Sequence, residues 1–210
     1  MLDLIIKNGK CYIDGQLKDV NISVKDGKIQ RIGQITEDAK DTIDATGLIV
    51  LPGCMDTQTH FREPGSTDTE DLHSGSRAAI VGGITSVFEM PNTDPPTSTK
   101  KEFQRKLDLA KNRMYCNYAF YFGATADNAN ELADLKNLEG CCGIKLFAGS
   151  STGNLLVADE KDIETVFKNY NINDKEVISW VDKVLTKKNG NNLKFLDSTY
   201  ELFDLSLIHI

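Results

Sequence analysis

Short apolar and β-branched stretches separated by turn dipeptides fill the start of the chain, at residues 2–7, 10–13, 20–25 and 28–32. The dipeptides between them are Asn8-Gly9, Asp14-Gly15 and Asp26-Gly27. Asn-Gly and Asp-Gly between such stretches are strong β-hairpin signals, because these residues tolerate positive φ. The pattern therefore predicts a small antiparallel β-sheet (β-sandwich) domain over residues 1–47.

After Gly47 the pattern changes to apolar strands separated by segments long enough to form helices. Thr99 and Glu102 have the spacing of a capping box at the start of one of these helices. A strand followed by a helix, repeated, predicts an α/β fold with a parallel sheet and right-handed crossovers. The expected strands are 48–51, 84–90, 115–122 and 144–148, and the expected helices are 71–81, 99–113 and 128–137.

Four strand-helix units fit either an open doubly wound sheet or half of an eight-stranded barrel. The first strand-to-helix loop carries His60 and Arg62 where a dinucleotide-binding fold needs a glycine-rich turn, so we favour the barrel. A (β/α)8 TIM barrel takes about 250 residues. We therefore expect residues 48–168 to form the first half of a truncated barrel, followed by an irregular or imperfect C-terminal segment at 169–210.

The composition and charge of the chain limit which kinds of partner it can bind. A formal charge of -7 and a pI near 5.0 disfavour nucleic acid and anionic membrane, because no basic surface is available to release phosphate counterions. The N-terminus lacks the features of a signal peptide, and no segment is long and apolar enough to span a bilayer. Five cysteines, an odd number without a CxxC pair, argue against a disulfide framework and favour a cytoplasmic location.

The densest cluster of chemically useful residues is the run Asp-Thr-Gln-Thr-His-Phe-Arg-Glu-Pro-Gly at residues 56–65. Alternate residues of a strand share a face, so Asp56, Gln58 and His60 can point at one site if they extend the first barrel strand. That site is the C-terminal mouth of the barrel, where barrel enzymes place their chemistry.

This run resembles the signature of dihydroorotases, members of the metal-dependent amidohydrolase superfamily. The resemblance covers roughly residues 1–160 and includes Met-Pro-Asn-Thr at 90–93 and Gly-Ile-Lys-Leu-Phe at 143–147. It implies an amidohydrolase-type barrel and a hydrolase that interconverts N-carbamoyl-L-aspartate and dihydroorotate in de novo pyrimidine biosynthesis. The Arg-Glu-Pro-Gly and Met-Pro-Asn-Thr elements point to the dihydroorotase branch, since hydantoinases and allantoinases usually lack the arginine.

The resemblance also implies a metal site with one or two Zn²⁺ (zinc) ions. His60 is then a metal ligand and Asp56 a supporting residue. Gln58 stands where most relatives have a ligand histidine, and its amide oxygen is a poor zinc ligand, so a mononuclear site is one alternative. Lys145 lies in an apolar strand, where either its ammonium group extends to water or its neutral amine forms a metal-bridging carbamate.

Arg62 and Asn92 are, by the same resemblance, the residues that bind the substrate carboxylate, and a guanidinium suits that role because it grips a carboxylate with two donors. The loop at 149–153 can present backbone amides to an anion. Further ligand histidines and a proton-shuttling aspartate are expected on later strands, yet no histidine lies between His73 and His209. We therefore expect the 210-residue chain itself to be inactive.

Two other functions remain open. A hydantoinase or allantoinase would share the fold and metals and act on a different cyclic amide. A non-catalytic, dihydroorotase-like subunit would support aspartate carbamoyltransferase, and the replacement of a ligand histidine by Gln58 motivates that alternative. The expected partners are a small-molecule substrate and either further copies of the chain in a homo-oligomer or that transferase.

Overall fold

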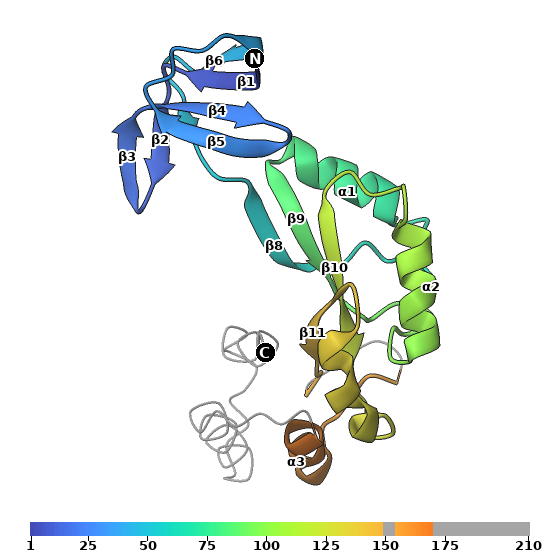
Figure 1. Cartoon of the computed structure of the whole chain (residues 1–210). Coiled ribbons are helices and arrows are strands. Elements are labelled where there is room, and N and C mark those ends of the chain that lie inside the picture. The colour runs from blue at the N-terminus through green and yellow to red at the C-terminus, as the bar shows by residue number, and fades with distance from the viewer. Residues whose placement is uncertain (149–153, 170–210) are drawn as a thin grey trace. The chain divides into compact units, whose positions relative to one another are not determined.

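The computed structural model describes residues 1–148 and 154–169 of the chain. The chain divides into two compact units, Met1–Cys54 and Met55–Ile210. Figure 1 colours the chain by residue number. No helix in the described part of the chain has the length and apolar character needed to cross a membrane.

The first unit contains two small sheets. One has the order β5-β4-β1-β6, and the other has the order β3-β2-β7. Each sheet contains both antiparallel and parallel strand pairs. The parallel pairs are β1 with β6 and β2 with β7. The expected antiparallel sheet is therefore mixed. The strands are β1 (Leu2–Lys7), β2 (Lys10–Ile13), β3 (Gln16–Asp19), β4 (Asn21–Lys25), β5 (Lys28–Gly33), β6 (Ala39–Asp44) and β7 (Ile49–Val50).

Two of the three predicted hairpins are confirmed. Asp14 and Gly15 have φ values of 53° and 77° between β2 and β3, and Asp26 and Gly27 have 51° and 72° between β4 and β5. Positive φ at both central residues is the type I′ geometry that matches strand twist. Asn8 also has positive φ, but it connects strands that lie in different sheets.

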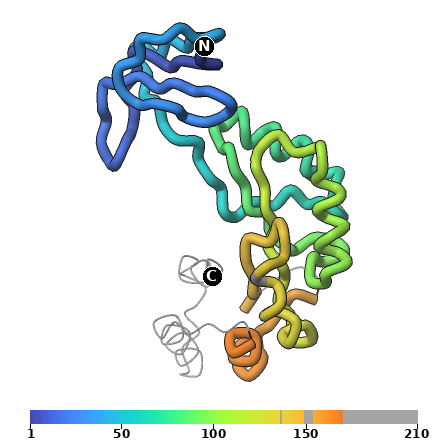
Figure 2. The backbone as a smooth tube through the Cα atoms, in the orientation of Figure 1, coloured from blue at the N-terminus to red at the C-terminus, as the bar shows by residue number. Residues whose placement is uncertain are grey.

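The second unit is a four-stranded sheet in the order β11-β10-β9-β8, in which β10 pairs parallel with both β9 and β11. Its α/β path can be followed in Figure 2. Helices α1 and α2 lie along one face of this sheet (Figure 1). The elements are β8 (Cys54–Thr59), α1 (Leu72–Val81), β9 (Ile84–Glu89), α2 (Lys100–Ala110), β10 (Asn117–Gly123), the 3₁₀ helix η1 (Ala129–Asn137), β11 (Cys141–Lys145) and α3 (Glu160–Asn169).

The first strand of this sheet differs from the expectation. Residues 48–51 do not begin the barrel sheet, because Ile49–Val50 forms β7 and pairs with Lys10 and Cys11 in the first unit. The strand that precedes His60 is Cys54–Thr59, a largely polar stretch that hydrophobic patterning overlooked. Its polar residues still alternate as expected, with Asp56 and Gln58 two positions apart and His60 directly after the strand.

Buried aromatic and aliphatic side chains between sheet and helices form the core of the second unit. Asp71 caps α1 by accepting a hydrogen bond from the Ser74 amide at 2.7 Å, and Thr99 caps α2 by accepting one from the Glu102 amide at 3.2 Å. These caps satisfy amides that the first helical turn leaves unpaired. The fully buried core residues include Leu72, Val87, Phe103, Phe120, Phe122 and Leu132.

Candidate functional site

The ends of β8 and β9 bring His60 and Asn92 together. The Met90 amide donates to the Thr59 carbonyl at 3.0 Å, which fixes one strand end against the other. Beyond this contact, His60 Nδ1 and Asn92 Oδ1 are 2.9 Å apart. The amide oxygen can only accept, so Nδ1 carries the proton and the lone pair of the ring lies on Nε2. This is the arrangement in which a histidine commonly binds a metal, with its other ring nitrogen held by a carbonyl.

The surroundings of His60 favour its neutral form. Burial lowers the pKa of the imidazole, and the nearby charges of Arg62, Lys145 and Lys106 lower it further, while the hydrogen bond with Asn92 opposes these effects. A neutral imidazole is the form that binds a metal ion. One region of the second unit therefore contains the predicted residue His60, with Arg62, Asn92 and Lys145 close enough to affect its pKa.

Arg62 occupies an unusual backbone conformation. Its φ of 62° lies in the left-handed region, which non-glycine residues seldom adopt. The preceding Phe61 is buried against α1, where a Cβ atom on Gly75 would overlap the phenyl ring. Phe61 packed on Gly75 thus anchors the loop that carries His60 and Arg62.

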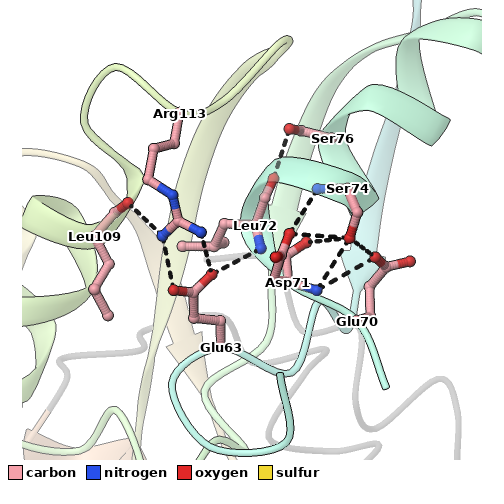
Figure 3. A network of polar contacts seen from close by, with 8 residues as sticks. All are labelled: Glu63, Glu70, Asp71, Leu72, Ser74, Ser76, Leu109 and Arg113. Atoms are coloured by element: carbon pink, nitrogen blue, oxygen red, sulfur yellow. Dashed lines mark hydrogen bonds and ion pairs between the residues drawn. The ribbon is translucent and has the colours of Figure 1, made fainter. Parts of the chain in front are cut away.

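Glu63 holds the other end of this loop (Figure 3). Its carboxylate accepts two hydrogen bonds from Arg113, at 2.7 and 3.1 Å, and one from the Leu72 amide at the start of α1, at 3.0 Å. The glutamate of the Arg-Glu-Pro-Gly element therefore connects the loop to α1 and to the segment after α2. Within the described residues its role is structural, and the sequence pattern alone did not show this.

Lys106 and Glu89 form a buried ion pair that sequence reasoning also missed. The side chain of Lys106 is 0% exposed and that of Glu89 is 1% exposed. Burial raises the pKa of Glu89 and lowers that of Lys106, and each opposite charge counteracts the shift of the other. A signal was available, because Phe103, Lys106 and Ala110 share the buried helical stripe of α2.

Lys145 ends β11 and is 3% exposed. Its ammonium nitrogen lies 4.9 Å from the centre of the Phe147 ring. Burial lowers the pKa of Lys145 to about 8, so a substantial share of the amine is neutral in mildly alkaline solution. The alternative in which the ammonium group extends to water does not match this burial.

Gln58 and Asp56 occupy the polar end of β8. Gln58 is partly buried, whereas Asp56 is exposed and accepts a hydrogen bond from the Gln58 amide at 2.9 Å through Oδ1. Asp56 therefore shapes the local backbone. The glycine and serine loop at 149–153, the C-terminal segment after residue 169 and His209 lie outside the described residues.

The described side chains fit part of a metal site. Among them, no group of three or more histidine, cysteine, aspartate and glutamate residues is close enough to hold a metal ion. The orientation and neutrality of His60 fit a metal ligand, and the lowered pKa of Lys145 favours the neutral amine that carbamate formation needs. Cys11, Cys116, Cys141 and Cys142 form no disulfide within the described part of the chain.

Comparison with known proteins decides the family. The family model for the amidohydrolase family matches residues 49–176. The chain belongs to the amidohydrolase family. Members of this family are generally metal-dependent.

The similar amidohydrolases include allantoinases. The chain is 40% identical over 162 residues to an allantoinase of Escherichia coli O1:K1 and 39% identical to one of Salmonella choleraesuis, in each case over 77% of this chain and 36% of the relative. The chain thus spans about 36% of the length of these relatives.

Two solved structures show the same fold. An L-hydantoinase (dihydropyrimidinase) from Arthrobacter aurescens has 31% identity and a TM-score of 0.72, covering 80% of this chain and 38% of that one. A D-hydantoinase (dihydropyrimidinase) from Thermus sp. has 26% identity and a TM-score of 0.63, covering 79% and 37%. The comparisons support the amidohydrolase part of the expectation and do not specifically support dihydroorotase.

Proposed function

We propose that this chain is part of a metal-dependent hydrolase that opens a C–N bond of a cyclic amide, of the allantoinase or hydantoinase type. The observation that carries the proposal is the neutral His60 held by Asn92 at the ends of two adjacent strands. Similarity to allantoinases and hydantoinases supports the substrate class. The same proposal includes that the whole protein forms a complete barrel and lies in the cytoplasm, and it extends to a homo-oligomer of the protein.

In this proposal His60 would hold a zinc ion through Nε2, and Lys145 would contribute a carbamate. The neutral Lys145 amine would add to carbon dioxide, so that an N–C bond forms while one C=O π bond becomes a C–O⁻ bond. The proton lost from nitrogen passes to water, and the product is an anionic carbamate. When bound, zinc supplies hydroxide at neutral pH and polarises the amide carbonyl. Gln58 lies on β8 at the position where most relatives have a ligand histidine. Residues outside the described ones would therefore complete the coordination of zinc. Asp56 supports this end of the strand.

Dihydroorotase is a second candidate, because of Arg62. Its guanidinium charge acts on His60, so it lies near the proposed reaction centre. Dihydroorotate carries a carboxylate, and a guanidinium with an adjacent amide such as Asn92 is well suited to bind one. Hydantoin has no carboxylate, so Arg62 would contribute less to its binding.

The test is to express the longest reading frame that contains this chain and to measure hydrolysis of allantoin, hydantoin and dihydroorotate together with bound zinc. We expect turnover of a cyclic amide and retention of zinc. In Arg62→Gln, a loss of at least tenfold in kcat/KM with dihydroorotate, beside an unchanged Arg77→Gln control, would assign the dihydroorotase function. Arg77 is exposed on α1 and is the matched control.

A protein without zinc and without turnover would contradict the enzymatic proposal. It would favour a non-catalytic subunit, for which binding to aspartate carbamoyltransferase is then the measurement. Zinc binding with hydrolysis of allantoin or hydantoin alone would exclude dihydroorotase.

A further inference from the structure

A buried ion pair lies directly behind the strand ends that carry His60 and Asn92. Glu89 is the last residue of β9, and Lys106 lies in the middle of α2. Both side chains are almost completely removed from water, and the Lys106 nitrogen also lies 5.0 Å from the centre of the Phe120 ring. Neither residue belongs to the proposed metal or substrate contacts.

Each member of the pair also contacts the backbone of one strand end. Glu89 Oε1 accepts a hydrogen bond from the Phe61 amide at 3.2 Å, directly after His60. Lys106 Nζ donates to the Met90 carbonyl at 2.9 Å, two residues before Asn92. The chain of contacts therefore runs from the His60 loop through Glu89 and Lys106 to the Asn92 loop.

Stability alone is a weak explanation for such a pair. Removing two charges from water costs more than burying apolar side chains of similar volume, and replacing a whole buried pair by apolar residues is often neutral or stabilising. Directional hydrogen bonds to two separate backbone segments supply what an apolar pair cannot, which is a fixed distance between those segments.

We propose that Glu89 and Lys106 are positioning residues, whose buried ion pair sets the separation of the two strand ends and thereby the hydrogen bond between His60 and Asn92. The inference rests on the proposed function for its catalytic consequence, since it assigns His60 and Asn92 to the reaction site. Its geometric content is independent of any metal. Partners that orient a metal-binding histidine commonly change metal affinity or activity by about 10–100-fold when removed.

The test uses the double variant Glu89→Gln/Lys106→Met in the full chain, which removes both charges and the donor to the Met90 carbonyl while keeping similar volumes. The matched control is Lys101→Met, the same lysine substitution on the exposed side of α2. Histidine ring ¹⁵N NMR is practicable because the chain has three histidines. The wild type and the control should show the Nδ1–H tautomer of His60.

In the double variant we expect a folded protein whose His60 ring, in the metal-free chain, loses its preference for Nδ1–H. In the longest reading frame that contains this chain, we expect the same double variant to lower zinc affinity by about tenfold, measured by competition with a chromophoric chelator. A second comparison, Val87→Ala in β9, lowers core packing while leaving both charges of the pair in place. If Val87→Ala changes the His60 tautomer as much as the double variant does, the pair has only a structural role and the proposal fails.

Unchanged His60 signals and zinc affinity in a folded double variant would likewise overturn the proposal. If the double variant does not fold, Glu89→Gln alone carries the test, because it keeps an oxygen for the Phe61 amide and removes the charge that holds Lys106. A shifted His60 tautomer in Glu89→Gln supports the proposal, and an unshifted one overturns it. Absence of zinc and turnover in the longest reading frame that contains this chain would refute the proposed function, while the NMR comparison in the chain itself would still decide the positioning role.

Discussion

At the scale of single residues, neighbours of His60 act on its protonation in opposite directions. The positive charge of Arg62 lowers the pKa of the imidazole, and the hydrogen bond to Asn92 raises it. We therefore expect Arg62→Gln to raise the pKa of His60 and Asn92→Ala to lower it. Histidine proton and nitrogen NMR titrations would measure both changes, with Arg77→Gln as a control. Shifts of the same sign in both variants would contradict the placement of these groups around His60.

Lys145 offers a second prediction, based on its buried charge. Burial lowers its pKa to about 8 from 10.5, so the folded chain binds this proton more weakly than the unfolded chain. Below the folded pKa both states are charged and the full cost of burial applies. As the pH rises from about 8 to 10.5, the folded state loses the proton first, and stability rises.

The measurement is the difference in unfolding free energy between the wild type and Lys145→Met at several pH values. We expect the wild type to gain roughly 1–3 kcal/mol relative to the variant between neutral and strongly alkaline pH, since one pKa unit corresponds to about 1.4 kcal/mol. In this difference between wild type and variant, the contributions of all other titrating groups to the unfolding free energy cancel. A difference that does not change with pH would show that burial does not destabilise the charged form of Lys145.

At the scale of elements, Glu63 joins three parts of the second unit. Its contacts with Arg113 and the Leu72 amide connect the His60 loop, α1 and the residues after α2. We expect Glu63→Ala to lower the free energy of unfolding by about 2–4 kcal/mol, because two charge-assisted contacts and a partner of the α1 amide are lost. Chemical denaturation monitored by circular dichroism would measure it.

The control is Arg105→Ala, which removes an exposed ion pair with Glu102 on α2. Such pairs contribute about 0–1 kcal/mol. Equal effects of the two variants would mean that the Glu63 contacts add nothing beyond a surface pair.

The elements also show what the sequence could predict. Strands bounded by Asp-Gly turns and helices with Asp71 or Thr99 caps were located to within a few residues, because their signals are local. Strands β3 and β6 are mostly exposed and polar, so no apolar pattern marked them. The predicted helix at 128–137 is a 3₁₀ helix over Ala129–Asn137, and the last strand begins at Cys141 instead of residue 144.

The sequence indicated candidate site residues at the ends of two predicted strands. His60 and Asn92 follow two predicted strands, and their hydrogen bond shows that these strand ends meet. The pairs formed by Glu63 with Arg113 and by Glu89 with Lys106 could not be derived in this way. Arg113 is separated from Glu63 by 50 positions, and charge alone does not identify which partner a buried carboxylate selects.

At the scale of the whole molecule, the division into two compact units predicts that local packing defects stay within their unit. In the first unit, a Cβ atom on Gly9 would lie 2.8 Å from both Ala45 Cβ and Val50 Cγ2. In the second, a Cβ atom on Gly75 would overlap the ring of Phe61. Each Gly→Ala substitution therefore overpacks one unit, at a cost of about 1–3 kcal/mol.

Hydrogen exchange followed by mass spectrometry distinguishes the units, because peptides on either side of Cys54 are measured separately. We expect Gly9→Ala to speed exchange in Met1–Cys54 only, and Gly75→Ala to speed it in the described residues after Cys54, including the loop with His60. The better helix propensity of alanine, worth about 0.5–1 kcal/mol, offsets only part of the clash at Gly75. If either substitution speeds exchange equally on both sides of Cys54, the two units unfold together, and a defect near β7 would then reach the candidate site.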